Sequence, residues 1–304
     1  MKHLLGIQHC TALDLERIID LGEAAKRDRG AAGDACKGLL EGQTWAMIFS
    51  KASTRTRVSF EVGVQEMGGN VIYLSSRDMQ LGRGEPIEDT ARVLGRMVHG
   101  AIIRTFDQSD VEIFAEYSDI PTINALTDEE HPCQIIADLV SIREKFGTWE
   151  GKKIVFLGDG NNNMSRSWMW AADRLGFDLV VAGPEMCLPD AAFRQNFTKG
   201  NISFSSDVDS AVADADVLYT DVWVSMGQEE LDEEGREEQL MAFQVNDAML
   251  SKAASNAMVL HCLPAYRGKE ITAEVLEARA DEIFTQAENR LHAQKGVIRY
   301  LVQE

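Results

Sequence analysis

The chain lacks any long hydrophobic run. No apolar stretch in its 304 residues approaches the roughly 18 needed to span a membrane. Its 45% hydrophobic and 26% charged residues are ordinary for a globular protein, which excludes a disordered chain as well as a membrane-spanning one. The apolar stretch after Lys2 is too short for a secretory signal, so we expect a cytoplasmic protein.

The sequence also lacks closely spaced cysteines. It has 5, an odd number, and no two of them form a C-x-x-C pair. This pattern argues against a disulfide framework and against a structural zinc site.

Basic residues are few relative to acidic ones. There are 30 Lys and Arg against 49 Asp and Glu, a formal net charge of −19. Nucleic acids and anionic lipids bind through Lys and Arg that neutralise phosphates, so neither is an expected partner. An anionic small substrate would need a local cluster of arginines.

Short apolar runs alternate with longer segments of helical period along the whole chain, which is typical of β-α-β units. The pattern predicts an α/β fold with two doubly wound parallel-sheet domains of similar size, joined by helices. The two glycines within residues 146–151 mark the expected break between them. We expect strands near residues 45–49, 71–74, 101–103, 121–126, 153–157, 179–182, 217–220 and 258–261, and a weaker one at 282–284.

The strongest local signal is the segment Ser53-Thr54-Arg55-Thr56-Arg57, which follows an expected strand and opens an expected helix. Hydroxyls, free N–H groups and the positive end of the helix dipole favour a phosphate there. Arginine adds a planar fork that binds two phosphate oxygens. The alternative interpretation is an ordinary Ser/Thr helix cap with exposed arginines.

Two further segments are expected at the same sheet edge. Arg104 ends one expected strand, and His131-Pro132-Cys133-Gln134 follows another and opens a helix. Open α/β sheets bind ligands at the carboxyl ends of their strands. Each residue alone is compatible with a surface position, but their agreement on one edge indicates an anion site.

In the second half, Gly158-Asp159-Gly160 and the asparagines 161–163 follow an expected strand. The dinucleotide fingerprint fails here because Asn163 stands where the third glycine belongs. Asp221 ends another strand and is followed by Ser225-Met226-Gly227. An aspartate in this place either binds a ligand's ammonium group or caps a loop.

His261 and Cys262 are neighbours at the end of an expected strand. Adjacent strand residues point to opposite faces, so a thiolate–imidazole dyad is not expected from this spacing. The sequence around Arg290 by itself predicts an exposed charge on a helix surface.

Together these segments resemble the aspartate/ornithine carbamoyltransferase family. Residues 53–57 resemble its carbamoyl phosphate motif, and residues 131–134 resemble its second motif. Asp221 with residues 225–227, and residues 261–265, resemble the segments that distinguish members acting on ornithine from those acting on aspartate. The resemblance spans nearly the whole chain.

The resemblance implies transfer of the carbamoyl group of carbamoyl phosphate to the δ-amine of L-ornithine, giving L-citrulline and phosphate. The reaction would serve arginine biosynthesis or, in reverse, arginine catabolism. The resemblance implies no cofactor, no metal and a homotrimer with shared active sites. Residues 1–147, with the helix 288–304 packed back on them, would bind carbamoyl phosphate, and residues 148–287 would bind ornithine.

The same resemblance assigns roles residue by residue. Carbamoyl phosphate would be held by Ser53, Thr54, Arg55, Thr56, Gln80 contributed by a neighbouring subunit, Arg104, His131, Gln134, Cys262, Leu263 and Arg290. Ornithine would be held by Asn162 or Asn163, Asp221, Ser225 and Met226, and catalysis would rest on Arg104, His131, Asp221 and Cys262. The spacing to Met164 and Ser167 favours Asn163 over Asn162.

Four alternatives remain, one of them a non-catalytic homologue, which the intact set of arginines and histidines disfavours. A carbamoyltransferase for putrescine is disfavoured by residues 225–227, which resemble a binder of an amino acid's α-groups. One for aspartate would want basic residues near Asp221. A nucleotide-binding oxidoreductase would need a third glycine after Gly160.

Overall fold

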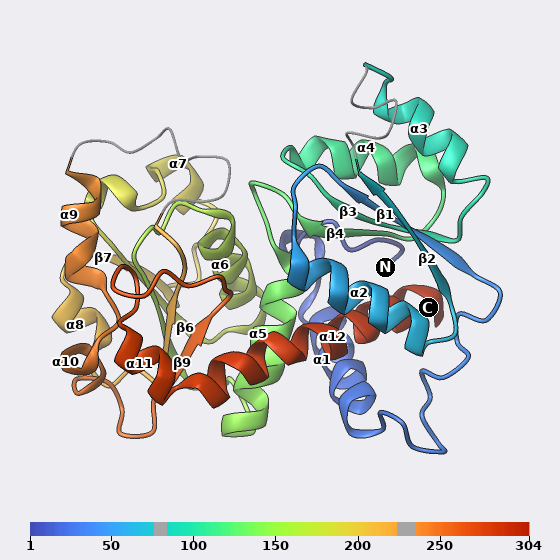
Figure 1. Ribbon diagram of the computed structural model, residues 1–304. Helices are drawn as coiled ribbons and strands as arrows, with labels where there is room; N and C mark the ends of the chain where they lie inside the picture. The colour runs from blue at the N-terminus through green and yellow to red at the C-terminus, as the bar shows by residue number, and fades with distance from the viewer. Residues whose placement is uncertain (76–83, 224–234, 304) are drawn as a thin grey trace. The chain divides into compact units, whose positions relative to one another are not determined.

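The protein is described here by a computed structural model covering residues 1–75, 84–223 and 235–303. The chain divides into two compact units, Met1–Val140 with Glu288–Glu304, and Ser141–Ala287. Each unit contains one parallel sheet covered by helices (Figure 1), which confirms the expected α/β fold with two parallel sheets.

The first unit is built on a four-stranded sheet of order β2-β1-β3-β4. Its strands are β1 (Thr44–Phe49), β2 (Asn70–Ser75), β3 (Gly100–Arg104) and β4 (Thr122–Leu126). Its helices are η1 (Ile7–His9), α1 (Ala12–Arg27), α2 (Thr54–Glu66), α3 (Ile87–Leu94), α4 (Gln108–Ser118) and the first part of α5 (Pro132–Phe146). Phe49 pairs in register with Ser75 and Arg104, so these strands end level with one another.

The second unit is built on a five-stranded sheet of order β7-β6-β5-β8-β9. Its strands are β5 (Lys153–Leu157), β6 (Asp178–Ala182), β7 (Ile202–Ser205), β8 (Val217–Thr220) and β9 (Met258–His261). Its helices are α6 (Asn163–Leu175), η4 (Glu185–Cys187), α7 (Ala191–Arg194), α8 (Val208–Val212), α9 (Arg236–Leu240), η6 (Met241–Phe243), α10 (Asp247–Leu250) and α11 (Ala273–Ala278). The last helix, α12 (Ala280–Gln303), begins in this unit and ends in the first.

Both sheets change winding direction at one place. In the first sheet the chain moves outward from β1 to β2 and then returns to place β3 on the other side of β1. In the second sheet β8 is placed beside β5 in the same way. Such switch points leave a crevice beyond the carboxyl ends of the two strands, where α/β proteins bind ligands.

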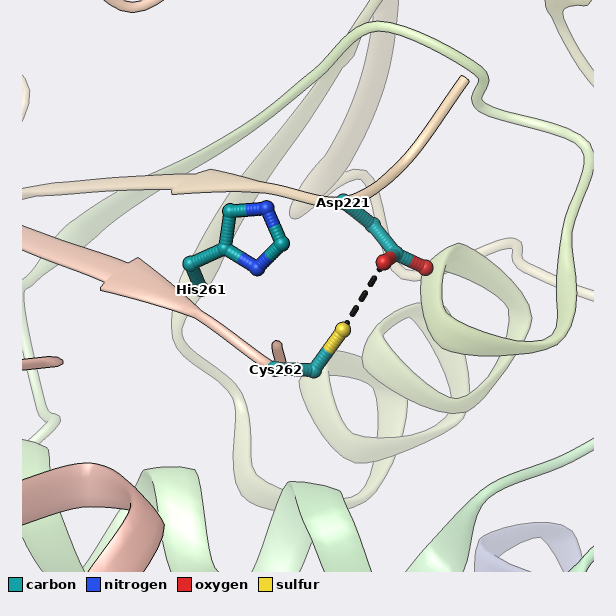
Figure 2. A group of neighbouring side chains, drawn as sticks. All are labelled: Asp221, His261 and Cys262. Atoms are coloured by element: carbon teal, nitrogen blue, oxygen red, sulfur yellow. Dashed lines mark hydrogen bonds between the residues drawn. The ribbon is translucent and has the colours of Figure 1, made fainter. Parts of the chain in front are cut away.

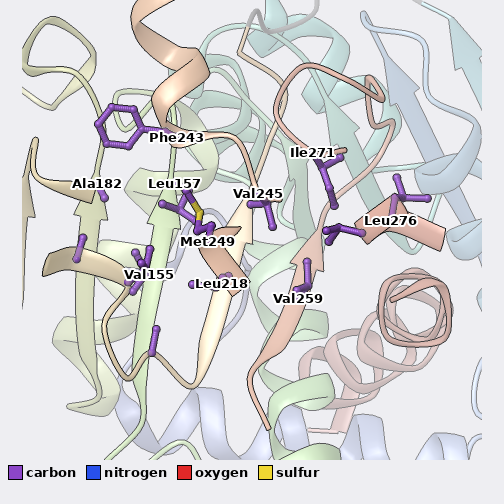
Figure 3. Packing of buried hydrophobic residues seen from close by; sticks show 14 of the residues in the cluster. Val155, Leu157, Ala182, Leu218, Phe243, Val245, Met249, Val259, Ile271 and Leu276 are labelled. Carbon is purple, nitrogen blue, oxygen red and sulfur yellow. The ribbon is translucent and has the colours of Figure 1, made fainter. Parts of the chain in front are cut away.

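Apolar side chains of the strands pack against the helices that cover each sheet. In the second unit Val155 of β5, Leu218 of β8 and Val259 of β9 pack against Met249 and Leu276 from α10 and α11 (Figure 3). In the first unit Ile48 and Ile103 pack against Ala91 of α3 and Phe114 of α4. The side chains that point into these cores are buried. Their packing fixes the strands, and with them the carboxyl ends of the strands that carry the polar side chains of the candidate site.

One sequence expectation is wrong, and two further elements had no signal in the sequence analysis. Residues 282–284 form the first turns of α12 and not a strand, because Ile283 alone enters the core while Glu282 lies in the acidic first turn of the helix. Strand β7 was not foreseen because it is a half-buried edge strand without an apolar run. Helix α1 was not foreseen either; it begins at a Thr11–Asp14 capping box.

Candidate active site

Helix α2 begins directly beyond the end of β1. The Ser53 hydroxyl caps it by accepting a hydrogen bond from the Thr56 backbone N–H at 3.3 Å. Thr54 is exposed, Arg55 is partly buried and Thr56 is buried. The first N–H groups of a helix have no partner within the helix, so this end of α2 offers an anion both hydrogen-bond donors and a positive dipole end.

Arg104 and His131 lie at the same edge of the first sheet. Arg104 ends β3 and is 3% exposed, and His131 precedes α5 and is 6% exposed. Burial, reinforced by the charges of Arg290, Arg104 and Arg55, holds the pKa of His131 well below its ordinary value of 6.5. His131 is therefore a neutral imidazole at neutral pH, and the arginines around it carry the positive charge.

Arg290 of α12 is a buried linker and not the exposed charge that its sequence suggested. Its Nη1 donates to Gln134 Oε1 at 2.6 Å, and its Nη2 donates to Thr56 Oγ1 at 3.1 Å. Gln134 in turn donates from Nε2 to Asp138 Oδ1 at 2.8 Å. One guanidinium thus joins α2, α5 and α12, three elements that are far apart in the sequence.

Arg57 does not join this cluster. It is exposed on α2, its guanidinium lies 4.0 Å from the centre of the Tyr73 ring, and its Nε is 3.3 Å from Glu61 Oε2. The structure therefore brings Arg55, Arg104, His131 and Arg290 together and leaves Arg57 on the surface.

The asparagine run of the second unit divides into three different environments. Asn161 is exposed, and its Oδ1 accepts from Arg166 Nη2 at 3.2 Å. Asn162 is buried and caps α6, its Oδ1 accepting from the Ser165 N–H at 2.9 Å. Asn163 is the first residue of α6 and is partly buried.

The side-chain amide nitrogen of Asn162 is buried. Within the described part of the chain its Nδ2 has no hydrogen-bond partner. A buried amide N–H without a partner costs free energy, so a ligand acceptor at this place would be stabilised.

Asp221 and Cys262 lie side by side at the ends of β8 and β9 (Figure 2). The Cys262 Sγ donates to Asp221 Oδ1 at 2.8 Å, and the Val222 N–H donates to the same oxygen at 2.7 Å. Burial raises the pKa of Asp221 above its ordinary value, and the hydrogen bonds from Cys262 and from the Val222 N–H counter that effect only in part. The carboxylate is consequently a better proton acceptor than a surface aspartate.

The His261 imidazole is hydrogen-bonded through both ring nitrogens, and one of them lies within 4.8 Å of the Cys262 Sγ, so the two side chains are closer than the alternation of strand side chains predicts. Its Nδ1 accepts from the Leu263 N–H at 2.8 Å, which leaves the proton on Nε2, 3.0 Å from Glu270 Oε1. His261 and Glu270 are both fully buried. Leu263 itself has a left-handed φ of 57°, a rare backbone conformation for a residue with a branched side chain.

Asp221, His261 and Cys262 each present a possible metal-ligand atom, and these atoms lie within 4.8 Å of one another. Both ring nitrogens of His261 are already engaged in hydrogen bonds, and the Cys262 thiol is engaged with Asp221. The donors present therefore fit a hydrogen-bonded array better than a metal centre.

Sequence reasoning missed two acidic residues near these groups. Glu270 follows a run of exposed residues and gave no sign that it would be buried beside His261. Asp159 is 2.7 Å from Arg236 Nη2, and burial raises its pKa while the Arg236 charge opposes the rise. Gln80, Ser225 and Met226, assigned above by resemblance, lie outside the described residues.

The two units are thus parallel α/β sheets, one with a cationic edge and one with an acid–thiol edge. The sequence profile of the aspartate/ornithine carbamoyltransferase carbamoyl-P binding domain matches residues 2–144, and that of the Asp/Orn binding domain matches residues 150–301. The chain belongs to the aspartate/ornithine carbamoyltransferase family.

Within this family, the similar proteins are ornithine carbamoyltransferases. The one from Akkermansia muciniphila is 56% identical over 302 residues, which cover 98% of this chain and 97% of that protein. The one from Methanocorpusculum labreanum is 47% identical over 98% of this chain and 97% of that protein. The solved structure of the Pyrococcus furiosus enzyme has a TM-score of 0.91 at 45% identity, covering 99% and 97% of the two chains.

None of the helices in the described ranges is both long and apolar enough to cross a membrane.

Proposed function

We propose that this protein transfers the carbamoyl group of carbamoyl phosphate to the δ-amine of L-ornithine, giving L-citrulline and phosphate. The observation that carries the proposal is the opposite chemistry of its two sheet edges. A cationic edge around the neutral His131 suits a phosphate dianion, and the paired Asp221 and Cys262 suit an amine. The names of the similar proteins agree with this assignment.

Carbamoyl phosphate is assigned to the first unit. The N-terminus of α2, with Ser53, Thr54, Arg55 and Thr56, would hold the phosphate group. Arg104, His131, Gln134 and Arg290 would hold the carbamoyl group. Gln134 already accepts from Arg290, and that bond would fix the orientation of its amide.

These donors would also lower the free-energy barrier of carbamoyl transfer. When an amine attacks the carbamoyl carbon, negative charge develops on the carbonyl oxygen, and the carbon–oxygen bond to phosphate then breaks. Arg104, the N–H of neutral His131 and the Thr56 hydroxyl would donate to that oxygen. A preorganised donor of this kind is worth about 3 kcal/mol in the transition state.

Ornithine is assigned to the second unit. Its δ-amine resembles a lysine, with an ordinary pKa near 10.4, so roughly one molecule in 2,500 is neutral at pH 7. Asp221, whose pKa is raised by burial, would accept the proton that the amine must lose, and Cys262 would orient the amine. Asn162 or Asn163, with Ser225 and Met226, would hold the α-amine and α-carboxylate.

The assembly and the cellular role belong to the same proposal. We assign a homotrimer in which Gln80 completes a neighbouring active site, a role in arginine biosynthesis or, in reverse, arginine catabolism, and a cytoplasmic location. All 5 cysteines lie among the described residues and none of them is in a disulfide, and 4 are buried, which suits a reducing compartment.

A carbamoylation assay tests the proposal. Purified protein is offered ornithine, putrescine and aspartate in parallel, each with carbamoyl phosphate, and the ureido product and phosphate are measured. Citrulline formed with ornithine, well above the other two products, is the expected result. Product only from putrescine or aspartate would refute it.

A further inference from the structure

Glu130, the residue directly before His131, has a buried carboxylate that faces the N-terminal segment of the chain. It is 1% exposed. Its Oε2 accepts from the Ile7 N–H at 2.8 Å, and its Oε1 accepts from the Gln8 N–H at 3.3 Å. A buried carboxylate is stable only where such donors replace water, so these contacts fix the side chain.

The backbone of Glu130 is held as firmly as its side chain. Its carbonyl accepts from the Thr127 N–H at 2.9 Å, and its N–H donates to Thr127 Oγ1 at 3.1 Å. Thr127 Oγ1 also donates to Gln108 Oε1 at 2.8 Å. The turn between β4 and the start of α5 is therefore fixed by its own hydrogen bonds and by the hydrogen bond to Gln108 of α4.

The N-terminal segment is anchored along the open edge of β4. The Leu4 N–H donates to the Thr122 carbonyl at 2.9 Å, and the Asn124 N–H donates to the Leu4 carbonyl at 2.7 Å. The Leu5 carbonyl accepts from Asn124 Nδ2 at 2.9 Å and from Gln108 Nε2 at 3.0 Å. The segment thus extends the first sheet by a short stretch of parallel strand and reaches Glu130 at its far end.

From these contacts we infer that residues 4–9 brace the first sheet edge, and that Glu130 is a positioning residue for His131. The two residues share a peptide bond, so a change in the Glu130 backbone moves the imidazole directly. His131 is buried among charged neighbours, and a small displacement would turn its N–H away from its target. The catalytic consequence rests on the proposed function, whereas the structural consequence does not.

Gly6 offers a second, independent way to disturb the brace. A Cβ atom at Gly6 would lie 2.4 Å from Glu130 Oε1 and 3.0 Å from Glu130 Cδ. The Gly6 backbone is extended, with a φ of −175°, so alanine is compatible with it. Gly6→Ala would therefore displace the carboxylate without changing its chemistry, while Glu130→Gln changes its chemistry and keeps its size.

The experiment compares Glu130→Gln, Gly6→Ala and a control, Asp190→Asn. Asp190 also accepts a backbone N–H at the start of a short helix, from Phe193 at 2.7 Å, but it lies in the second unit. Hydrogen exchange reports on residues 5–9. The imidazole signals of the 6 histidines in ¹³C-histidine-labelled protein are assigned with His131→Asn. Steady-state kinetics give kcat and KM.

Both brace variants are expected to speed exchange in residues 5–9 and to shift the His131 signal, leaving the His261 signal in place. We expect kcat to fall about ten-fold while KM for ornithine changes less than about two-fold. The control should change neither the His131 signal nor kcat. The assignment is overturned if residues 5–9 are loosened in either variant while the His131 signal and kcat stay at wild-type values. A wild-type protein without carbamoylation activity would refute the proposed function, and the His131 signal would still test the brace.

Discussion

The Cys262 thiol lies 2.8 Å from an Asp221 carboxylate oxygen, and the two residues come from the ends of neighbouring parallel strands. The register that pairs Thr220 with His261 puts the next residue of each strand at the same edge. An acid and a thiol separated by 41 positions thereby form one hydrogen-bonded pair. This pair is the one to which we assign the ornithine amine.

Replacement of Asp221 by Asn should reduce activity and raise stability. We expect kcat/KM for ornithine to fall about 100-fold or more, because the proton acceptor is lost. Burial raises the folded-state pKa of Asp221, so the folded protein loses stability as pH rises from the unfolded carboxyl's value through the folded pKa. Asn does not titrate, so the Tm of the variant should exceed that of wild type more at pH 8 than at pH 4.

Asp207→Asn is the matched control for that pH dependence. Asp207 is an exposed helix cap whose pKa is lowered by its side-chain and backbone hydrogen bonds from Ser210. Its contribution to stability is present above the unfolded pKa, so this variant should have a lower Tm than wild type at pH 8. Unchanged ornithine kinetics in Asp221→Asn would contradict the role of Asp221 as proton acceptor. A Tm of Asp221→Asn below that of wild type at pH 8 would contradict the rise in the Asp221 pKa caused by burial.

His131→Asn should reduce kcat by roughly 100-fold, the effect of removing one oxyanion donor. The substitution should also change how the stability of the folded state depends on pH in the acidic range. The folded-state pKa of His131 is well below 6.5, so the unfolded chain binds a proton first and the folded state loses stability as pH falls below about 6.5.

The wild-type Tm should therefore fall more steeply than the variant's between about pH 7 and pH 5. His99→Asn, at an exposed position just before β3 and outside the brace, should keep the wild-type kcat. Parallel Tm curves for wild type and His131→Asn would show that the imidazole is not held neutral by its surroundings.

Arg55→Ala and Arg57→Ala form a matched pair, two residues apart on α2. Loss of Arg55 should raise KM for carbamoyl phosphate roughly 10- to 100-fold, because a charge-assisted contact to a phosphate is removed. Arg57 is exposed and engaged with Glu61 and Tyr73, so its loss should change that KM by less than about three-fold. Inhibition constants for inorganic phosphate should follow the same order. Equal effects from the two variants would contradict the assignment of the phosphate contact to Arg55 and not to Arg57.

Asn162→Asp and Asn163→Ala should separate the two candidate ornithine-binding asparagines. Aspartate is as good a helix cap as asparagine, so Asn162→Asp should keep the cap while it replaces Nδ2, which has no partner among the described residues, with an oxygen; the buried charge should lower the Tm at neutral pH. We expect KM for ornithine to rise about ten-fold or more in this variant and to change little in Asn163→Ala. The reverse order would assign ornithine to Asn163, as the sequence spacing favours.

Salt should stabilise the protein. The chain carries a net charge of −19, and ions at high concentration screen the repulsion among like surface charges. We expect Tm to rise between about 0.1 and 2 M KCl, with sucrose at equal osmolality as the control for general exclusion effects. A Tm that is flat or falling with KCl would leave the acidic excess without a role in stability.

Much of the architecture follows from local patterning. Eight apolar runs became strands within about a residue of their expected bounds, because buried parallel strands are almost uniformly apolar. The exceptions have local causes: β7 is a half-buried edge strand, and Ile283 is a single apolar residue on an otherwise polar helical turn. The motif at residues 53–57 could be placed at a helix start because a strand ends just before it.

Contacts between residues remote in sequence had no such signal. Arg290 meets Gln134 and Thr56 at sequence separations of 156 and 234, and local periodicity carries no information on such pairings. The same holds for Glu130 and Ile7, 123 positions apart.

Residue types and their order along the chain were enough to predict two parallel sheets, the edges where ligands bind and the family that the motifs resemble. Packing then decided which polar groups are buried and which are exposed. Burial makes His131 neutral and Asp221 a stronger base, and it separates Arg55 from Arg57 on one helix. These properties depend on the distance to other charges and to water, and those distances exist only once the chain is folded.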